Sequence, residues 1–286
     1  PGVAEKELEV ATDSLQLTFS NVGGAIKKIS LKSFKASNSA ENLDLVNLTN
    51  PNEYLLNMSS TMYPGLDTSP YSVQRSDDVI TYTLNSEGLE IIKRYKLHKS
   101  KHGIELSITV KNLSGSSKPF SYRIIGGAGV SEAKNDDKRF VEVTANLNGK
   151  ALGFKRPKPS QLITNPGSVS WTALKNKYFS LVLKPFAVTE AQFYSEDKNG
   201  ALVMGIAMEG VSIQPINYDL AEKLKLGEPH GALISDVGPD TPAQKAGIQR
   251  GDVVVEFNRT PIRDMNHLRY VVASTEIGKT VDVKII

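Results

Sequence analysis

The sequence of 286 residues contains no cysteine. This absence excludes disulfide bonds, zinc-thiolate sites and thiol nucleophiles, and it suits a bacterial envelope protein as well as a cytosolic one. The sequence also lacks an apolar run approaching the ~20 residues that a transmembrane helix needs. No basic-then-apolar leader is present at Pro1. We therefore expect the chain, as it stands, to be soluble.

A strong excess of charge of one sign is missing too. The formal net charge is +3, and residues 210–286 carry nine Lys/Arg against ten Asp/Glu. Neither part of the chain is basic enough to indicate a nucleic-acid partner. There is no phosphate-binding loop and no metal-ligand cluster with credible spacing, so we expect no cofactor and no metal site.

What is present is ordinary globular composition, 40% hydrophobic and 23% charged, in a chain long enough for about two domains. From Ser14 to about Pro215, short alternating apolar segments separated by turn residues predict an antiparallel β-sandwich or barrel. Residues 15–19 and 25–31 form the first predicted hairpin, around a turn at 21–24. Further strands are predicted at 79–84, 89–97, 104–110 and 178–183.

Two segments break this pattern. Ser168 to Lys177, around the single tryptophan Trp171, is the best helical candidate of this part of the chain. Residues 145–166 are rich in Gly, Pro, Lys and Asn, which predicts a long exposed excursion from the sandwich.

Three blocks of this region carry a resemblance to a known family. They are Leu15-Gln-Leu-Thr-Phe-Ser-Asn-Val-Gly-Gly, the pair of segments starting at Ile92-Lys-Arg-Tyr and Ile104-Glu-Leu-Ser, and Trp171-Thr-Ala-Leu-Lys-Asn-Lys-Tyr-Phe. In order and spacing they resemble the large periplasmic domain of the YidC membrane insertase. The resemblance implies a mainly β fold, the β-supersandwich that this domain shares with sugar mutarotases. It also implies a periplasmic, membrane-anchored parent protein in contact with the membrane or the translocation machinery.

The mutarotase-like fold raises an enzymatic alternative, because ring opening of a sugar requires a His acid and a carboxylate base across a cleft. The available histidines here are His98 and His102, and polar alternation on a solvent-facing hairpin explains both without chemistry. The same hairpin holds the densest basic run of the chain, Lys93 to Lys101. It is read either as a solvated edge protected against strand addition or as a surface for anionic lipid headgroups.

Helix and turn signals change after Pro215. A short helix is predicted from Asn217, a strand at 232–237, and a helix starting at Pro242, capped by Asp240 or Thr241 and stopped by Gly247. A strand at 253–257, a helix capped by Asp264 and a final strand at 281–285 follow. The run Pro239-Asp-Thr-Pro-Ala-Gln-Lys-Ala-Gly-Ile-Gln-Arg-Gly-Asp closely resembles the PDZ domain of HtrA/DegP-type proteases. We expect a small α+β PDZ domain at 210–286 after a supersandwich at 1–209.

A PDZ domain binds the extended C-terminal segments of proteins by strand addition beside a helix. The resemblance implies an accepting strand at Val211, Ser212, Ile213 and Gln214, a carboxylate loop at Glu209 and Gly210, and a facing wall of Leu268, Val271 and Val272. Glu209 departs from the apolar-Gly-apolar pattern of that loop and places negative charge near an incoming carboxylate.

Residues 210–215 belong to both resemblances at once, so each module looks truncated there. A natural fusion and a composite or engineered chain both remain open. We expect a non-enzymatic insertase or chaperone ectodomain with a peptide-binding PDZ module. The alternatives are an HtrA-type protease fragment or a mutarotase-like carbohydrate-active enzyme. A Ser-His-Asp arrangement is not found, since Gly126-Gly-Ala-Gly carries no serine.

Overall fold

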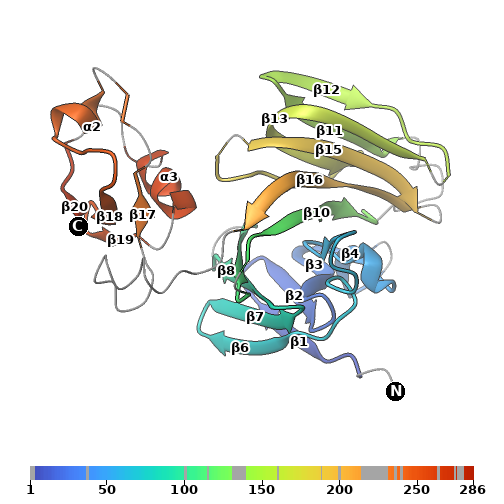
Figure 1. The fold of residues 1–286 in the computed structure, drawn as a ribbon. Helices are drawn as coiled ribbons and strands as arrows, with labels where there is room; N and C mark the ends of the chain where they lie inside the picture. The colour runs from blue at the N-terminus through green and yellow to red at the C-terminus, as the bar shows by residue number, and fades with distance from the viewer. Residues whose placement is uncertain are drawn as a thin grey trace. The chain divides into compact units, whose positions relative to one another are not determined.

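A computed structural model describes residues 4–36, 39–99, 102–114, 116–130, 140–159, 161–187, 189–198, 201–213, 231–234, 237–238, 241–262, 265–273, 275 and 280–286. The chain divides into an N-terminal unit, Pro1–Ile216, and a C-terminal unit, Asn217–Ile286. Figure 1 shows the strands and helices of both units.

Three antiparallel sheets build the N-terminal unit. The first contains β1 (Glu7–Ala11), β2 (Leu15–Ser20), β3 (Ala25–Lys35) and β4 (Asn42–Asn47). The second contains β6 (Ser72–Ser76), β7 (Val79–Ser86), β8 (Leu89–Leu97) and β9 (Ile104–Asn112). The third has the order β12 (Lys150–Phe154), β11 (Glu142–Leu147), β13 (Leu162–Lys175), β15 (Thr189–Lys198), β16 (Ala201–Ile213), β10 (Lys118–Ala128) and β5 (Met58–Ser59), with β14 (Ser180–Leu183) on β13. A 3-10 turn, η1 (Pro51–Glu53), precedes β5.

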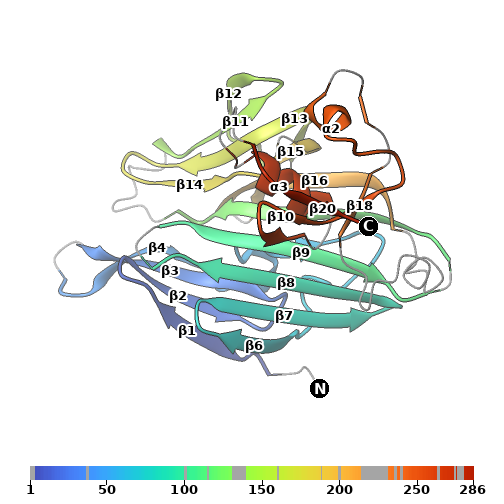
Figure 2. The same cartoon turned by 90° about the vertical axis from the view of Figure 1, so that its left-hand side faces the viewer.

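Alternating apolar side chains hold the first two sheets face to face (Figure 2). The Phe19 ring of β2 lies 5.1 Å from the Tyr95 ring of β8 and 6.3 Å from the Tyr82 ring of β7. Gly24 makes this approach possible, because its φ is +52° and a Cβ there would lie 2.9 Å from Cβ of Tyr82. The predicted first hairpin and the predicted strands at 79–84, 89–97 and 104–110 are confirmed.

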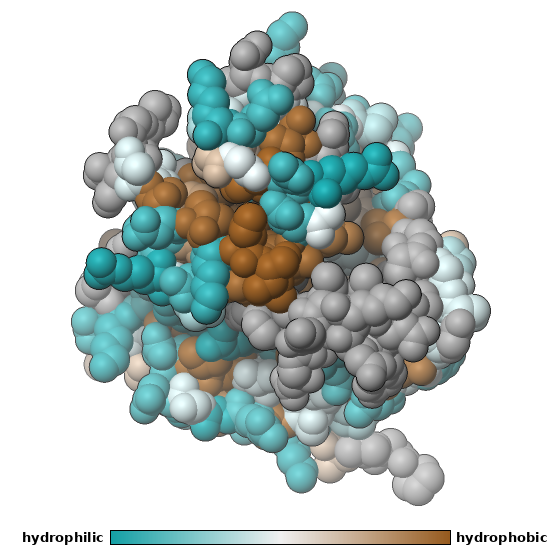
Figure 3. Space-filling view, turned by 60° about the vertical axis from the view of Figure 1, so that its left-hand side comes forward, coloured by the Kyte–Doolittle hydropathy of each residue, from teal (hydrophilic) through white to brown (hydrophobic). Residues whose placement is uncertain are grey.

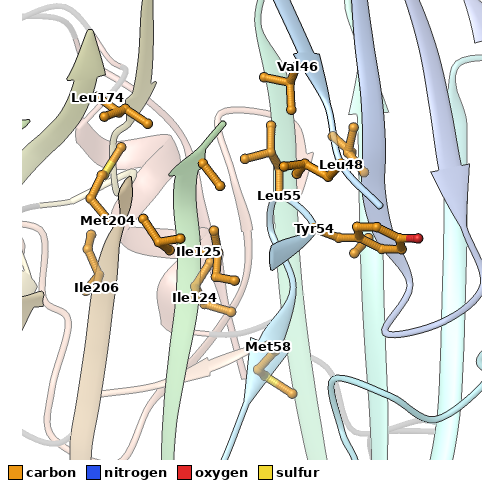
Figure 4. Packing of buried hydrophobic residues seen from close by; sticks show 14 of the residues in the cluster. Val46, Leu48, Tyr54, Leu55, Met58, Ile124, Ile125, Leu174, Met204 and Ile206 are labelled. Atoms are coloured by element: carbon orange, nitrogen blue, oxygen red, sulfur yellow. The ribbon is translucent and has the colours of Figure 1, made fainter. Parts of the chain in front are cut away.

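The third sheet is curved, so that β10 contacts β13 and β14 of the same sheet, and it shares one hydrophobic core with the other two sheets. Gly126 and Gly127 of β10 let the neighbouring layer come close, since a Cβ on them would meet Leu183 at 2.6 Å and Leu174 at 2.9 Å. Figure 4 shows Ile124 and Ile125 of β10 between β16, with Met204 and Ile206, and the segment that carries Leu55 and Met58. The glycines of this run therefore allow close packing against β10.

The helix predicted at Ser168–Lys177 is wrong, because Ser168 to Lys175 belong to β13 and pair with β11 on one edge and with β15 and β14 on the other. The described residues of 145–166 are largely exposed, as predicted, and they include the β11–β12 hairpin and the start of β13 at Leu162. The alternation from Val169 to Leu174 and the sheet partners on both edges override the weak helical signal around Trp171.

The C-terminal unit is a small α+β fold. Its sheet contains β17 (Ala232–Leu233), β18 (Val253–Phe257), β19 (Thr260–Pro261) and β20 (Val283–Ile285), with α2 (Pro242–Lys245) and α3 (Met265–Ala273) beside it. The Thr241 side chain accepts a hydrogen bond from Gln244 N, which confirms the predicted cap of α2. The predicted helix after Asn217 and the cap at Asp264 lie outside the described residues. The buried core cluster of this unit consists of Ala232, Val254, Ile262 and Leu268.

Within the parts of the chain described above, no helix is long and apolar enough to cross a membrane.

Candidate functional site

Helix α3 supplies an apolar wall that its own unit only partly covers. Leu268 is buried against β17 and β18, and Val271 packs beside it half-buried. Val272, one residue further, keeps 47% of its surface exposed, and Leu233 of β17 keeps 46%. Figure 3 colours the described residues by hydropathy and shows hydrophobic side chains exposed among hydrophilic ones. Apolar surface left open beside a strand is what an extended peptide needs.

The predicted accepting strand lies elsewhere in the fold. Residues 209–213 are the end of β16 in the N-terminal unit, where Val211 pairs with Phe120, Ser212 with Pro119 and Ile213 with Lys118. Gln214 is outside the described residues. The structure thus places Leu268, Val271 and Val272 in one unit and Glu209 to Ile213 in the other, which differs from the domain assignment predicted from the sequence. Whether these residues bind a peptide stays a prediction.

Glu209 is exposed on β16. Its Oε2 accepts a hydrogen bond from Gln192 Nε2 at 3.0 Å. Glu209 is therefore a strand residue of the N-terminal unit that is hydrogen-bonded to the neighbouring strand.

The end of β16 has a recorded strand partner on one side only. β15 accompanies β16 only as far as Ala207, so the pairings recorded for Val211 to Ile213 are those with β10. A bulge separates this part from the main ladder, since Tyr122 pairs with Met208 but Phe120 pairs with Val211. The carbonyl oxygens of Pro119 and Ser121 face away from β16 and accept hydrogen bonds from the hydroxyls of Tyr63 and Ser60.

A second unusual feature is Lys93, whose side chain is completely buried. Its Nζ donates to Gly23 O at 2.8 Å and to Leu56 O at 2.6 Å, and it lies 5.9 Å from the ring centroids of Tyr71 and Tyr95. Burial lowers the pKa of Lys93 from 10.5 to about 7, because the charged form loses its hydration.

This burial corrects the reading of Lys93 as part of a solvated or lipid-facing basic run. On β8, Lys93 occupies the inward-facing set of Leu89, Ile91, Tyr95 and Leu97, while Arg94 and Lys96 face outward. The alternation was visible in the sequence and could have placed Lys93 inside.

The two histidines lie at the turn between β8 and β9. His98 Nε2 lies 2.8 Å from Glu105 Oε1 on the neighbouring strand, and both side chains are partly exposed. His102 is exposed in the loop between the strands. Across the described ranges, no group of three or more His, Asp or Glu residues is placed to hold a metal ion.

Two family models match the chain. Residues 7–219 match the model described as "YidC periplasmic domain", and residues 233–286 match the model described as "PDZ domain". The first match spans well over half of the chain. The second lies within the C-terminal unit.

Curated relatives resemble the PDZ region. A "Probable periplasmic serine endoprotease DegP-like" of Hahella chejuensis is 42% identical over 77 residues, which is 27% of this chain and 16% of the relative. A protein of the same name from Marinomonas sp. is 34% identical over 140 residues, 49% of this chain and 27% of the relative. The chain thus spans about a quarter or less of the curated relatives that it matches.

Solved structures resemble the chain in fold. A galactose mutarotase-like protein from Lactobacillus casei has a TM-score of 0.52 at 14% identity, covering 71% of this chain and 87% of that one. A galactose mutarotase related enzyme from Lactobacillus acidophilus has a TM-score of 0.51 at 9% identity, covering 74% and 94%. At these identities the similarity establishes the β-supersandwich fold alone.

Proposed function

The chain belongs to the YidC periplasmic domain family, and from this premise we propose that it is the non-catalytic periplasmic part of a YidC-type membrane protein insertase that carries a peptide-binding PDZ module. The N-terminal unit serves as a rigid β scaffold. The C-terminal unit recognises extended C-terminal segments of other proteins.

The observation that carries the proposal is the open apolar wall of α3. Helix α3 buries Leu268 and leaves Val272 about half exposed, and Leu233 of the neighbouring strand β17 is about half exposed too, so both elements keep open apolar surface. Strand addition next to such a helix gives affinity through main-chain hydrogen bonds and selectivity through side-chain pockets. The family match of residues 233–286 supports the same role.

A periplasmic location accords with the names of the matching family model and of the DegP-like relatives. In the parent protein we propose that the N-terminal unit is tethered at the membrane and contacts the membrane or the translocation machinery. The buried position of Lys93 removes one of the cations that would have served a lipid contact on the β8–β9 hairpin.

The proposal is tested with fluorescent peptides that end in Val, Leu or Phe. We expect binding in the micromolar range, measured by fluorescence anisotropy, and a loss of at least tenfold for Val272→Asp. The exposed neighbour Arg269 provides a matched control on the same helix, and Arg269→Ala should leave the affinity within about twofold. Peptides with a C-terminal carboxamide test recognition of the free carboxylate. An absence of binding across such a set would contradict the proposal.

A further inference from the structure

The match to the YidC model and the match to the DegP-like relatives overlap on one short strand. The YidC model reaches residue 219, so it includes the end of β16. The DegP-like matches cover the PDZ region, and a match of 77 residues does not fit within Asn217–Ile286, which has 70. Such a match must extend into residues 210–216. Residues 210–216 are thus included both in the YidC match and in the DegP-like match.

In the structure these residues are part of the YidC-like N-terminal unit. Val211–Ile213 extend β16 along β10, past a bulge and opposite Pro119. Their recorded partners lie on the β10 side alone. Glycine at 210 lies in the bulge, where the backbone can bend at low cost. This extension is paired on one side only, as Ala201 and Leu202 are at the other end of the strand.

The C-terminal unit has an apolar surface that suits the same residues. Its core cluster has four buried members among the described residues, while Val272 and Leu233 stay half exposed. Val211 and Ile213 are two apart, so in a strand they lie on one face. An apolar face of this kind, set beside α3, would extend that small core.

We infer that Val211–Ile213 is an exchangeable strand with two mutually exclusive positions, one on β10 of the N-terminal unit and one in the sheet of the C-terminal unit. In the second position the domain boundary falls at 209/210, as the sequence predicts, and the strand is available to accept a peptide. Its regulatory consequence rests on the proposed peptide binding: pairing with β10 withholds the accepting strand. A ligand that binds only the second position shifts the balance toward it.

A disulfide can lock the first position, and the absence of native cysteine makes the experiment clean. Pro119 and Ser212 are directly paired, and paired residues of antiparallel strands have Cα atoms about 4.5–5.5 Å apart, which suits a disulfide. The variant Pro119→Cys/Ser212→Cys is compared in its oxidised and reduced forms. The control is Lys198→Cys/Ala201→Cys, a paired position at the other end of the same strand.

The first readout needs no peptide. If the strand visits the C-terminal unit, the lock removes part of that unit's core, and amide hydrogen exchange in α3 and β18 should become at least tenfold faster in the oxidised form. Reduction should restore it, and the control lock should have no effect. Equal exchange in the oxidised and reduced forms would overturn the inference.

The second readout is peptide affinity, which we expect to fall at least tenfold on oxidation and to recover on reduction. If peptide binds equally to the locked and the reduced protein, strand exchange is wrong and the proposed function stands. If the lock changes exchange in α3 but no form binds peptide, strand exchange stands and the proposed function fails.

Discussion

Three sheets of the N-terminal unit close around one core in which Phe19, Tyr95 and Lys93 are fully enclosed, whereas the single sheet of the C-terminal unit carries a helix whose Val272 is half exposed. In the first unit even a buried amino group has backbone carbonyls as hydrogen-bond partners. The second leaves apolar surface in contact with water. The N-terminal unit is therefore suited to act as a scaffold. The C-terminal unit is suited to bind a partner, because open apolar surface is retained where a partner covers it.

The largest expected effect comes from removing a ring from the N-terminal core. Phe19→Ala deletes a fully buried side chain that contacts Tyr82 and Tyr95, and we expect it to lower the free energy of unfolding of that unit by about 3–5 kcal/mol. Hydrogen exchange resolved by segment should show faster opening of β2 and β8 and unchanged exchange in α3. The matched variant Leu268→Ala should do the reverse. Equal losses in both units after either change would break the comparison.

The second prediction concerns the pH dependence of the N-terminal unit. The pKa of Lys93 is about 7 in the folded chain and 10.5 when it is exposed. Between these values the unfolded state binds one more proton, so stability rises with pH across this window and is lost as pH falls toward 7. One full proton corresponds to about 1.4 kcal/mol per pH unit, so we expect a gain of up to about 2 kcal/mol from pH 7 to 8.5.

Urea unfolding at several pH values measures this slope. Lys93→Met should abolish it, whatever its effect on stability at pH 7, and Lys96→Met on the exposed face of β8 should preserve it. The series should stop near pH 9.5, because burial raises the pKa of Tyr82 and Tyr95 and their ionisation lowers stability at higher pH. An unchanged slope in Lys93→Met would show that this lysine is charged when folded.

The smallest expected effect lies in the C-terminal unit. Thr241→Ala removes the side-chain acceptor for Gln244 N and should cost that unit about 1 kcal/mol. Thr241→Ser, which keeps the hydroxyl, should retain most of the stability. The loss should appear as faster exchange in β18 and α3, with no change in β8. A cost of zero would mean that α2 contributes nothing to the stability of the small unit.

The sequence predicted best where one local pattern had no competitor. The strands Leu89–Leu97 and Val253–Phe257 have the predicted bounds, because clear alternation or a short apolar run is bounded by turn residues in each case. The β11–β12 hairpin was missed although Asn148-Gly149 is a strong hairpin signal, with φ of +52° and +78°. The Gly and Lys content of residues 145–166 favours exposed loops and exposed hairpins alike, so composition did not indicate the hairpin.

The candidate site was harder to predict for a physical reason. The α3 wall follows from helical spacing within one segment. Val211–Ile213 fit two sheets by their own alternation, and the choice between them depends on strand partners far away in the chain, such as Phe120. Local sequence does not carry that information.

The enclosed amine of Lys93 can also be used to detect opening of the N-terminal unit. A neutral amine reacts with acylating reagents, and the low pKa supplies that form near neutral pH, but the surrounding carbonyls and rings keep reagents out. Acylation at Lys93 therefore takes place only when the three sheets separate. Mass spectrometry of this one position would time the opening of the scaffold and would be blind to the C-terminal unit.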